Sequence, residues 1–292
     1  MQNESLLGAI EAGGTKFVLA VARTPGDILA RQEIPTLTPE DTLAEAARWF
    51  DAQGRLSALG IATFGPAQLD ESAPDWGHIL DTPKPGWSHC DLAGYFARRY
   101  GIPIGFDTDV NGAALAEYCM GAGQGAAGMA YVTVGTGIGG GLVLGGELVH
   151  GAGHPEMGHY HSKRAADDVS YSGFCPFHGD CLEGLASGPA ILDRWGATLS
   201  DLGSEHEAVD RVAGYLGQLC HSLFALTAVE TVVLGGGVTK TPGLLGKIDE
   251  SARLAGNNYL PGRARQKIVP PALGDNAGVT GALLLAEAAR AS

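Results

Sequence analysis

Glycine-rich segments follow short apolar runs at three places in the chain, and they constrain the fold more than any other feature. The apolar runs 6–10, 129–134 and 231–234 lead into Glu11-Ala-Gly-Gly-Thr-Lys16, Gly135-Thr-Gly-Ile-Gly-Gly-Gly141 and Gly235-Gly-Gly237. The first two loops precede a second apolar run, which predicts a β-hairpin with a glycine turn in each case. The 45 glycines have no fixed period, so a collagen-like structure is excluded. They indicate instead places where the backbone turns sharply or approaches a ligand.

The recurrence of strand, glycine loop and strand predicts two similar lobes of the α/β class. Helices are expected over about 42–52, 91–100, 112–118, 209–227 and 278–290. We therefore expect a small lobe over residues 1–118, completed by the C-terminal helix 278–292. Residues 119–277 form the expected large lobe.

Composition excludes several classes of protein. Hydrophobic residues make up 45% of the 292-residue chain and charged residues 17%, which is typical of a globular protein. The net charge of -13 disfavours nucleic acid and anionic membranes as partners. The first residues lack the basic region of a signal peptide, and no apolar run reaches the roughly 20 residues of a membrane span. We expect a cytoplasmic protein.

Cysteine and histidine residues cluster near the middle of the chain. Cys175, His178 and Cys181 lie within seven residues, and His159 precedes them in Glu156-Met-Gly-His159. Thiolate and imidazole groups at such short intervals suit one tetrahedral zinc ion. His154 and His161 are nearby competitors that we interpret as surface histidines. The odd total of five cysteines fits metal ligands plus buried thiols, so Cys90, Cys119 and Cys220 are expected in the core.

Asp109 is the candidate general base, because it follows an apolar strand at a place where α/β folds bind ligands. The alternative is that Asp109 caps the following helix, although Asp107 can take that role. Asn111 can orient a ligand or cap the helix. The turn at Gly13, Gly14 and Thr15 lacks the P-loop spacing, but its N–H groups and hydroxyl can still contact phosphate oxygens.

Taken together, these motifs resemble the ROK family of sugar kinases, which also includes transcriptional repressors. The resemblance covers about residues 7–286. It is carried by the Gly-Gly-Thr turn, Thr108-Asp-Val-Asn111, Glu156-Met-Gly-His159 and the cluster ending Cys181-Leu-Glu183. The fructokinase branch is favoured by Glu11-Ala-Gly-Gly-Thr-Lys-Phe17, Phe64-Gly-Pro66, Thr82-Pro-Lys-Pro-Gly-Trp87 and Gly274-Asp-Asn-Ala-Gly278. The resemblance implies the actin/hexokinase-like (ribonuclease H-like) ATPase fold, with a cleft between two lobes.

The resemblance implies that Asp109 is the catalytic base, which deprotonates the sugar 6-hydroxyl for attack on the γ-phosphate of ATP. Glu11 occupies the family position near Mg²⁺, where many members have aspartate. The implied nucleotide contacts are Glu11, Gly13, Gly14, Thr15, Lys16, Gly135, Thr136, Gly137, Gly235 and Gly236. The implied sugar contacts are Gly65, Pro66, Thr108, Asp109, Glu156, His159 and Glu183.

The implied zinc ligands are His159, Cys175, His178 and Cys181. Many family members carry C-x-C-G-x-x-G-C, whereas this loop is one residue shorter and has His178 in place of the middle cysteine. A closed site with four ligands indicates a structural zinc ion rather than a catalytic one. His159 would then bind both the metal and the sugar.

The predicted activity is that of a fructokinase, a phosphotransferase that acts on an alcohol group and converts ATP and fructose to ADP and fructose 6-phosphate. Mannose, glucose or an amino sugar are alternative substrates on the same scaffold. A sugar-responsive repressor of the same family is a further alternative, but the first predicted strand begins too early for a preceding DNA-binding domain. The resemblance also favours a homodimer.

Overall fold

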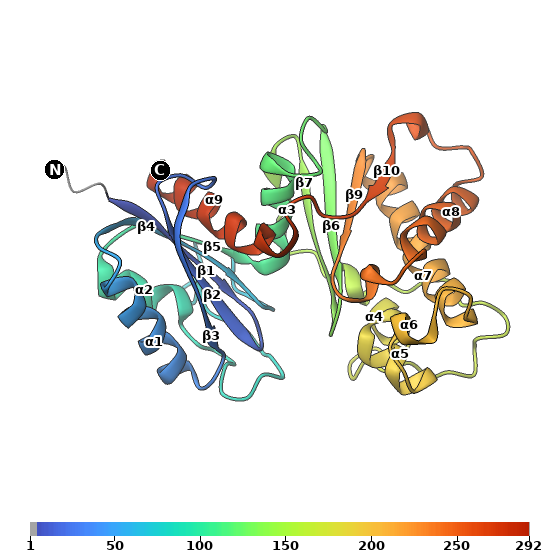
Figure 1. Ribbon diagram of the computed structural model, residues 1–292, viewed down its shortest axis with the longest axis horizontal. Helices are drawn as coiled ribbons and strands as arrows, with labels where there is room; N and C mark the ends of the chain where they lie inside the picture. The colour runs from blue at the N-terminus through green and yellow to red at the C-terminus, as the bar shows by residue number, and fades with distance from the viewer. Residues whose placement is uncertain (1–4, 292) are drawn as a thin grey trace. The chain divides into compact units, whose positions relative to one another are not determined.

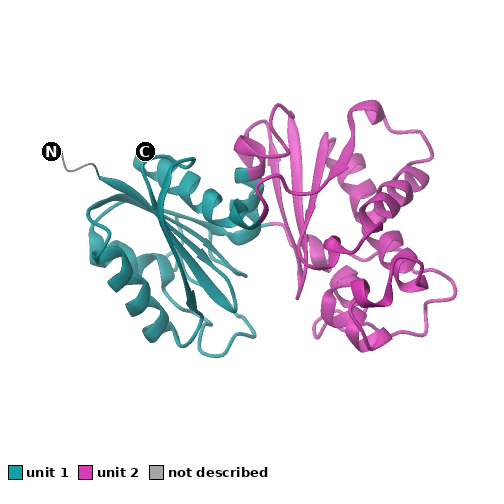
Figure 2. Ribbon diagram, in the orientation of Figure 1, with its two compact units in different colours: residues 1–116, 150–154, 275–292 teal, residues 117–149, 155–274 magenta. Residues whose placement is uncertain are grey.

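The computed structural model describes residues 5–291, so the residues 1–4 considered above for a signal peptide lie outside the described part of the chain. The chain forms two compact units (Figures 1 and 2). Unit 1 consists of Met1–Ala116, His150–His154 and Asp275–Ser292, and unit 2 of Glu117–Val149 and Pro155–Gly274. Unit 1 therefore takes a five-residue segment from the middle of the chain in addition to the C-terminal helix.

Unit 1 contains a five-stranded sheet in the order β3-β2-β1-β4-β5. Strands β1, β2 and β3 pair antiparallel, whereas β4 pairs parallel with both β1 and β5. The strands are β1 (Leu6–Ala12), β2 (Lys16–Ala22), β3 (Ile28–Pro35), β4 (Leu56–Thr63) and β5 (Ile104–Thr108). The helices of this unit are α1 (Pro39–Asp51), α2 (Leu92–Tyr100), α9 (Ala277–Ala291) and most of α3 (Asp109–Met120).

The two faces of this sheet are covered by different helices, as the alternation of side chains along a strand requires. Ile10 of β1 packs with residues of α1 and α2, whereas Leu7 and Ala9 pack with residues of α9. Helices α1 and α2 thus lie on one face of the sheet and α9 on the other (Figure 1). Gly60 of β4 lets α9 come close, because a Cβ there would lie 1.7 Å from the carbonyl oxygen of Ala282. The C-terminal helix is thus part of the unit that contains the N-terminal strands.

Unit 2 repeats this arrangement around a second five-stranded sheet, in the order β10-β9-β6-β7-β8. An antiparallel hairpin, β6 with β7, again lies beside a parallel strand, here β9. The strands are β6 (Gly128–Val134), β7 (Ile138–Leu144), β8 (Glu147–Leu148), β9 (Thr231–Gly235) and β10 (Lys267–Val269). The α-helices are α4 (Leu182–Ala186), α5 (Gly188–Trp195), α6 (Leu199–Leu202), α7 (Glu207–Thr227) and α8 (Leu244–Gly256). The short 3₁₀ helices are η1 (Met157–His159), η2 (Val238–Lys240) and η3 (Arg263–Arg265). A fourth, η4 (Gly274–Asn276), lies at the boundary of the two units.

The cysteines outside the cluster do not share one environment. Cys220 is buried in the core of unit 2, but Cys90 is only half-buried and Cys119 is exposed. The prediction that all three lie in the core is therefore wrong for Cys119, which is the second-last residue of α3 and is exposed. Across residues 5–291, no helix combines the length and the apolar character needed to cross a membrane.

Candidate functional site

The glycine turn of unit 1 joins β1 to β2 and is closed by a hydrogen bond from Gly13 N to Lys16 O of 3.0 Å. The hydroxyl of Thr36 donates to Gly13 O at 2.7 Å and steadies the turn from outside. Gly14 and Thr15 are exposed, and a Cβ at Gly14 would meet no atom within 4 Å. The turn therefore presents free backbone surface of the kind that phosphate oxygens contact. The ammonium of Lys16 lies 2.8 Å from Glu33, so this side chain forms an ion pair on β3.

Glu11 is the last polar side chain of β1 before that turn. Its Oε2 atom is buried and has no hydrogen-bond partner within residues 5–291. Burial raises the pKa of Glu11, although Arg31 and Lys16 act in the opposite direction. A buried carboxylate with a spare oxygen is costly unless a cation compensates it. The position therefore fits a residue that holds a divalent cation such as Mg²⁺, which oxygen ligands bind.

The β5–α3 junction holds the candidate base. Asp109 is the first residue of α3, and its Oδ1 accepts from Val110 N at 2.8 Å. The hydroxyl of Thr108 accepts from Asn111 N at 3.2 Å, which is the hydrogen bond that a helix N-cap makes. Asp107 is buried and accepts from Asn111 Nδ2 at 2.7 Å. Thr108 is therefore the residue that caps α3 through Asn111 N, rather than Asp109 or Asp107, and Asp107 holds the Asn111 side chain.

Gly65 and Pro66 follow β4 and are joined by a cis peptide bond. His154, from the segment that unit 1 takes from the middle of the chain, lies against this turn, and its Nε2 accepts from Ala67 N at 3.3 Å. His154 is therefore a half-buried loop residue bonded to backbone, and it is not one of the four clustered metal-ligand candidates. His161 does lie at the surface, with 62% of its side chain exposed.

The glycine turn of unit 2 joins β6 to β7 and contacts Glu183. Gly135 N donates to Gly137 O at 2.9 Å, and Gly188 N donates to Gly135 O at 2.8 Å. Glu183 Oε2 accepts from Ile138 N at 2.8 Å, just after Thr136 and Gly137. A Cβ at Gly137 would lie 2.8 Å from the same oxygen, so only glycine leaves room for the carboxylate. Glu183, a predicted sugar-binding residue, therefore lies directly beside the turn of unit 2 that is predicted to bind phosphate.

Gly235 and Gly236 end β9 next to that hairpin. Gly236 has φ of +93°, and a Cβ there would lie 2.3 Å from the carbonyl oxygen of Val134. A side chain at this position is therefore excluded twice, by backbone conformation and by space. The result is a bare backbone turn beside the Gly135 loop, as the sequence pattern suggested.

The four predicted metal ligands lie together, with their ligand atoms all within 4.8 Å of one another. The two Nδ1 atoms of His159 and His178 are 3.2 Å apart. His159 Nδ1 lies 3.8 Å from Cys175 Sγ and 3.5 Å from Cys181 Sγ. A tetrahedral zinc ion with ordinary bond lengths requires about 3.3 Å between two nitrogens and about 3.6 Å between nitrogen and sulfur. The spacing of these atoms therefore fits zinc.

A tight loop creates this arrangement. Cys175 and Gly179 exchange two backbone hydrogen bonds of 3.1 and 2.9 Å, and Gly179 has φ of +61°. Cys181 then forms the N-cap of α4, whose second residue is Glu183. Burial raises the pKa of the Cys181 thiol to about 11, so a thiolate there needs a compensating cation. The Cys/His cluster and Glu183 are therefore linked through one short helix.

Glu156 begins the 3₁₀ turn that presents His159, since His159 N donates to Glu156 O at 3.0 Å. Gly158 in the same turn packs on β7, where a Cβ would lie 1.8 Å from the carbonyl oxygen of Ile138. The Glu156 side chain is exposed. Glu156, His159 and Glu183 thus extend from segments that pack on the β6–β7 hairpin or bond to it.

Sequence reasoning missed a network of charges that holds this loop. Asp168 is fully buried and accepts hydrogen bonds from Arg194 and from the hydroxyl of Tyr215. Arg164 lies 3.8 Å from Asp168 and also donates to Asp180, at 2.7 Å, within the loop that carries the ligands. No sequence signal separated Asp168 from its exposed neighbour Asp167, because both lie in an irregular segment.

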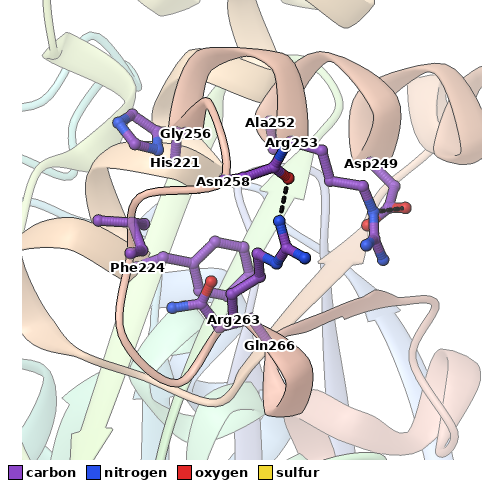
Figure 3. Close-up of a pocket in the computed structure, with 10 residues that line it drawn as sticks. His221, Phe224, Asp249, Ala252, Arg253, Gly256, Asn258, Arg263 and Gln266 are labelled. Atoms are coloured by element: carbon purple, nitrogen blue, oxygen red, sulfur yellow. Dashed lines mark hydrogen bonds and ion pairs between the residues drawn. The ribbon is translucent and has the colours of Figure 1, made fainter.

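A cavity of about 50 Å³ lies elsewhere in unit 2, between α7, α8 and the segment that follows α8 (Figure 3). None of the predicted site residues lines it. Its walls include His221 and Phe224 from α7 and Arg263 beyond α8, whose guanidinium donates to the side chain of Asn258 (Figure 3). The cavity has room for a water molecule or two, whereas ligand sites for small molecules usually exceed about 300 Å³.

The fold and these turns define a sugar kinase of the actin-like ATPase fold. The ROK hexokinase from Thermus thermophilus matches with a TM-score of 0.80 and 29% identity, covering 97% of this chain and 98% of that chain. A ROK family glucokinase from Streptomyces griseus, solved in complex with glucose and AMPPNP, matches with a TM-score of 0.75 and 26% identity over 99% of this chain and 100% of that chain. The predicted fold class is confirmed.

The chain belongs to the ROK family, whose model matches residues 7–289. The fructokinase of Zymomonas mobilis is 43% identical over 298 residues, covering 99% of both chains. A putative fructokinase of Bacillus subtilis is 43% identical over 289 residues, covering 97% of this chain and 96% of its own. The predicted family is therefore confirmed.

Proposed function

We propose that this protein is an ATP-dependent fructokinase that converts ATP and D-fructose to ADP and D-fructose 6-phosphate. The observation that carries the proposal is the position of Asp109, a carboxylate at the first residue of α3, where Thr108 rather than Asp109 makes the N-cap hydrogen bond. Near-full-length similarity to fructokinases supports fructose as the sugar and agrees with the activity expected from the sequence.

In this mechanism Asp109 accepts the proton of the sugar 6-hydroxyl as its oxygen attacks the γ-phosphorus of ATP. The new P–O bond forms while the bond between the γ-phosphorus and the β,γ-bridging oxygen breaks, and ADP leaves. Such reactions depend mainly on positioning and on neutralisation of charge. Thr108, Glu156, His159 and Glu183 bind sugar hydroxyls as acceptors and donors, while Gly65 and Pro66 contact the ring.

The glycine turns bind the nucleotide. The turn at Gly13, Gly14 and Thr15 contacts the β- and γ-phosphates, as does the turn at Gly135, Thr136 and Gly137 in unit 2. Gly235 and Gly236 leave room for the adenosine. Glu11, whose buried Oε2 has no hydrogen-bond partner in the described chain, would hold Mg²⁺, and the ion would neutralise phosphate charge. The ion pair with Glu33 holds Lys16 on β3, so a contact of Lys16 with phosphate requires that pair to open.

His159, Cys175, His178 and Cys181 hold a structural zinc ion in this proposal. With four protein ligands, such an ion would contribute to folding stability rather than to the reaction. The thiolate ligands require reduced cysteines, which fits a cytoplasmic protein. The proposed assembly is a homodimer, which light scattering would test.

The decisive experiment is a coupled assay of ADP formation with fructose, mannose, glucose and N-acetylmannosamine. Fructose should give the highest kcat/KM, and equal rates on all four sugars would contradict the proposed specificity. Asp109→Asn should reduce kcat at least about 1000-fold, because it keeps the shape of the junction but removes the base. Fructose binding by this variant, measured by calorimetry, should persist. Turnover like that of the wild type would exclude Asp109 as the base.

A further inference from the structure

Two histidines lie in the segment His150–His154, which packs with unit 1 although the chain on both sides of it belongs to unit 2. One histidine contacts the segment beside the Gly65–Pro66 turn, and the other contacts the junction between β5 and α3. His154 Nε2 accepts from Ala67 N beside the Gly65–Pro66 turn, at 3.3 Å. His150 Nε2 lies 2.8 Å from Oδ2 of Asp107, at the end of β5. The segment therefore contacts the β5–α3 junction, which carries Asp109.

Asp107 is a buried carboxylate, with 4% of its side chain exposed, and both of its oxygens are used. Oδ1 accepts from Thr108 N and from Asn111 Nδ2, each at 2.7 Å. Oδ2 is the atom that faces His150. A buried carboxylate is costly without a positive partner, and His150 supplies that partner at Oδ2. Asn111 Nδ2 is also 3.4 Å from His150 Nε2, so the three side chains form one cluster.

The charge of His150 depends on this contact. The hydrogen bond to Asp107 raises the pKa of His150, and partial burial opposes that change only in part. Asp107, from β5, is the charged group in contact with the ring, while α3 contributes the neutral Asn111. Since the pKa of the folded state is raised, the ion pair is complete at low pH. It is lost as the pH rises through the raised pKa of His150.

We propose that His150 is a positioning residue for phosphoryl transfer: protonated His150 holds Asp107, and Asp107 holds the Asn111 amide and the backbone that place Asp109. This inference rests on the proposed function, because it takes Asp109 as the base. His150 does not bind the sugar in this scheme. Its loss should therefore lower kcat more than it changes KM for fructose, since small displacements of a base are costly for the reaction step.

The test compares pH profiles of the full-length wild type and His150→Asn. The kcat of the wild type should decline on the alkaline side as His150 loses its proton. The variant should have kcat lower by about 10-fold at pH 6.5, no such alkaline decline, and KM for fructose within about two-fold. The matched control is His89→Asn, which removes a histidine 3.1 Å from Asp81 on the exposed surface of unit 1. It should retain the profile of the wild type.

A second measurement does not use activity. Histidine side-chain NMR of the wild type should give His150 a pKa above about 6.5, and Asp107→Asn should lower it. A His150 pKa at or below that value overturns the proposal, even if His150→Asn does not fold. Wild-type kcat and pH profile in His150→Asn also overturn it. If the wild type does not phosphorylate fructose, the proposed function fails instead, and the same profiles are measured with the hexose that is turned over.

Discussion

Replacement of Asp168 by asparagine should destabilise unit 2 strongly. This carboxylate has no exposed surface, and the guanidinium groups of Arg164 and Arg194 lie within ion-pair distance of it. The side chains of Arg164 and Arg194 are only 14% and 18% exposed, so solvent cannot replace the lost charge. Removal of one partner of a buried ion pair costs about 3–5 kcal/mol. For a unit of roughly 150 residues that unfolds in one transition, this corresponds to a fall in Tm of about 10 °C.

The pH dependence gives a second part of this prediction. Burial raises the pKa of Asp168, but the hydrogen bonds from Arg194 and Tyr215 outweigh it, so the pKa of the folded state lies below the usual value. A lowered pKa means that the stabilisation is complete above the unfolded pKa, about 3.9, and is lost as the pH falls through the folded pKa. The difference in Tm between the wild type and Asp168→Asn should therefore be full at pH 7 and shrink in acid.

The adjacent residue provides the control. Asp167 forms a two-bond ion pair with Arg211 at 2.7 and 3.0 Å, but its side chain is 74% exposed. Asp167→Asn should change Tm little, because exposed ion pairs contribute little to stability. Thermal unfolding followed by circular dichroism at pH 7 compares the two variants directly. Equal Tm values for Asp168→Asn and Asp167→Asn would refute the reasoning about burial.

Two further predictions concern the core and the metal. Gly60→Ala should destabilise unit 1 by about 3 kcal/mol, since its Cβ would overlap the Ala282 carbonyl, whereas Gly246→Ala in α8 meets no atom within 4 Å and should stabilise by up to about 1 kcal/mol. Denaturant unfolding measures both, and equal effects would contradict the packing of α9 on the sheet. Protein purified without chelators should contain about one zinc per chain, and its removal should lower Tm and fructose affinity together if His159 binds both the ion and the sugar, as proposed. Metal-free protein with full fructose affinity would exclude this role of zinc.

Features with a strong local signal were predictable from the sequence. The hairpins were predicted because apolar runs and glycine turns are signals of a few residues, and α7 was predicted because its apolar stripe is long. Strand β3 was missed because it lies at a sheet edge and seven of its eight residues lie outside the core. Helix α8 was missed as well, since Gly246 and the αL residue Gly243 at its start weaken the helical pattern.

Some residues of the candidate site could likewise be predicted from the sequence, and others could not. Asp109, Glu11 and the metal ligands could be proposed because their residue types and short spacing carry chemistry. His150 and Asp168 could not, because their importance depends on partners far along the chain: Asp107 is 43 residues from His150, and Tyr215 is 47 residues from Asp168. Such contacts depend on tertiary packing, which a single sequence does not reveal.

The packing of α9 on the first sheet has a consequence for synthesis of the protein. One face of that sheet is covered by residues 277–291, so its apolar side chains, including Leu7 and Val18, have no cover until nearly the whole chain has been made. Unit 2, in contrast, is complete before α9 emerges from the ribosome. Domains generally fold as units during translation, so unit 2 should fold before unit 1. Until α9 is made, the apolar side chains of the N-terminal strands remain uncovered, and uncovered apolar strands are prone to aggregation.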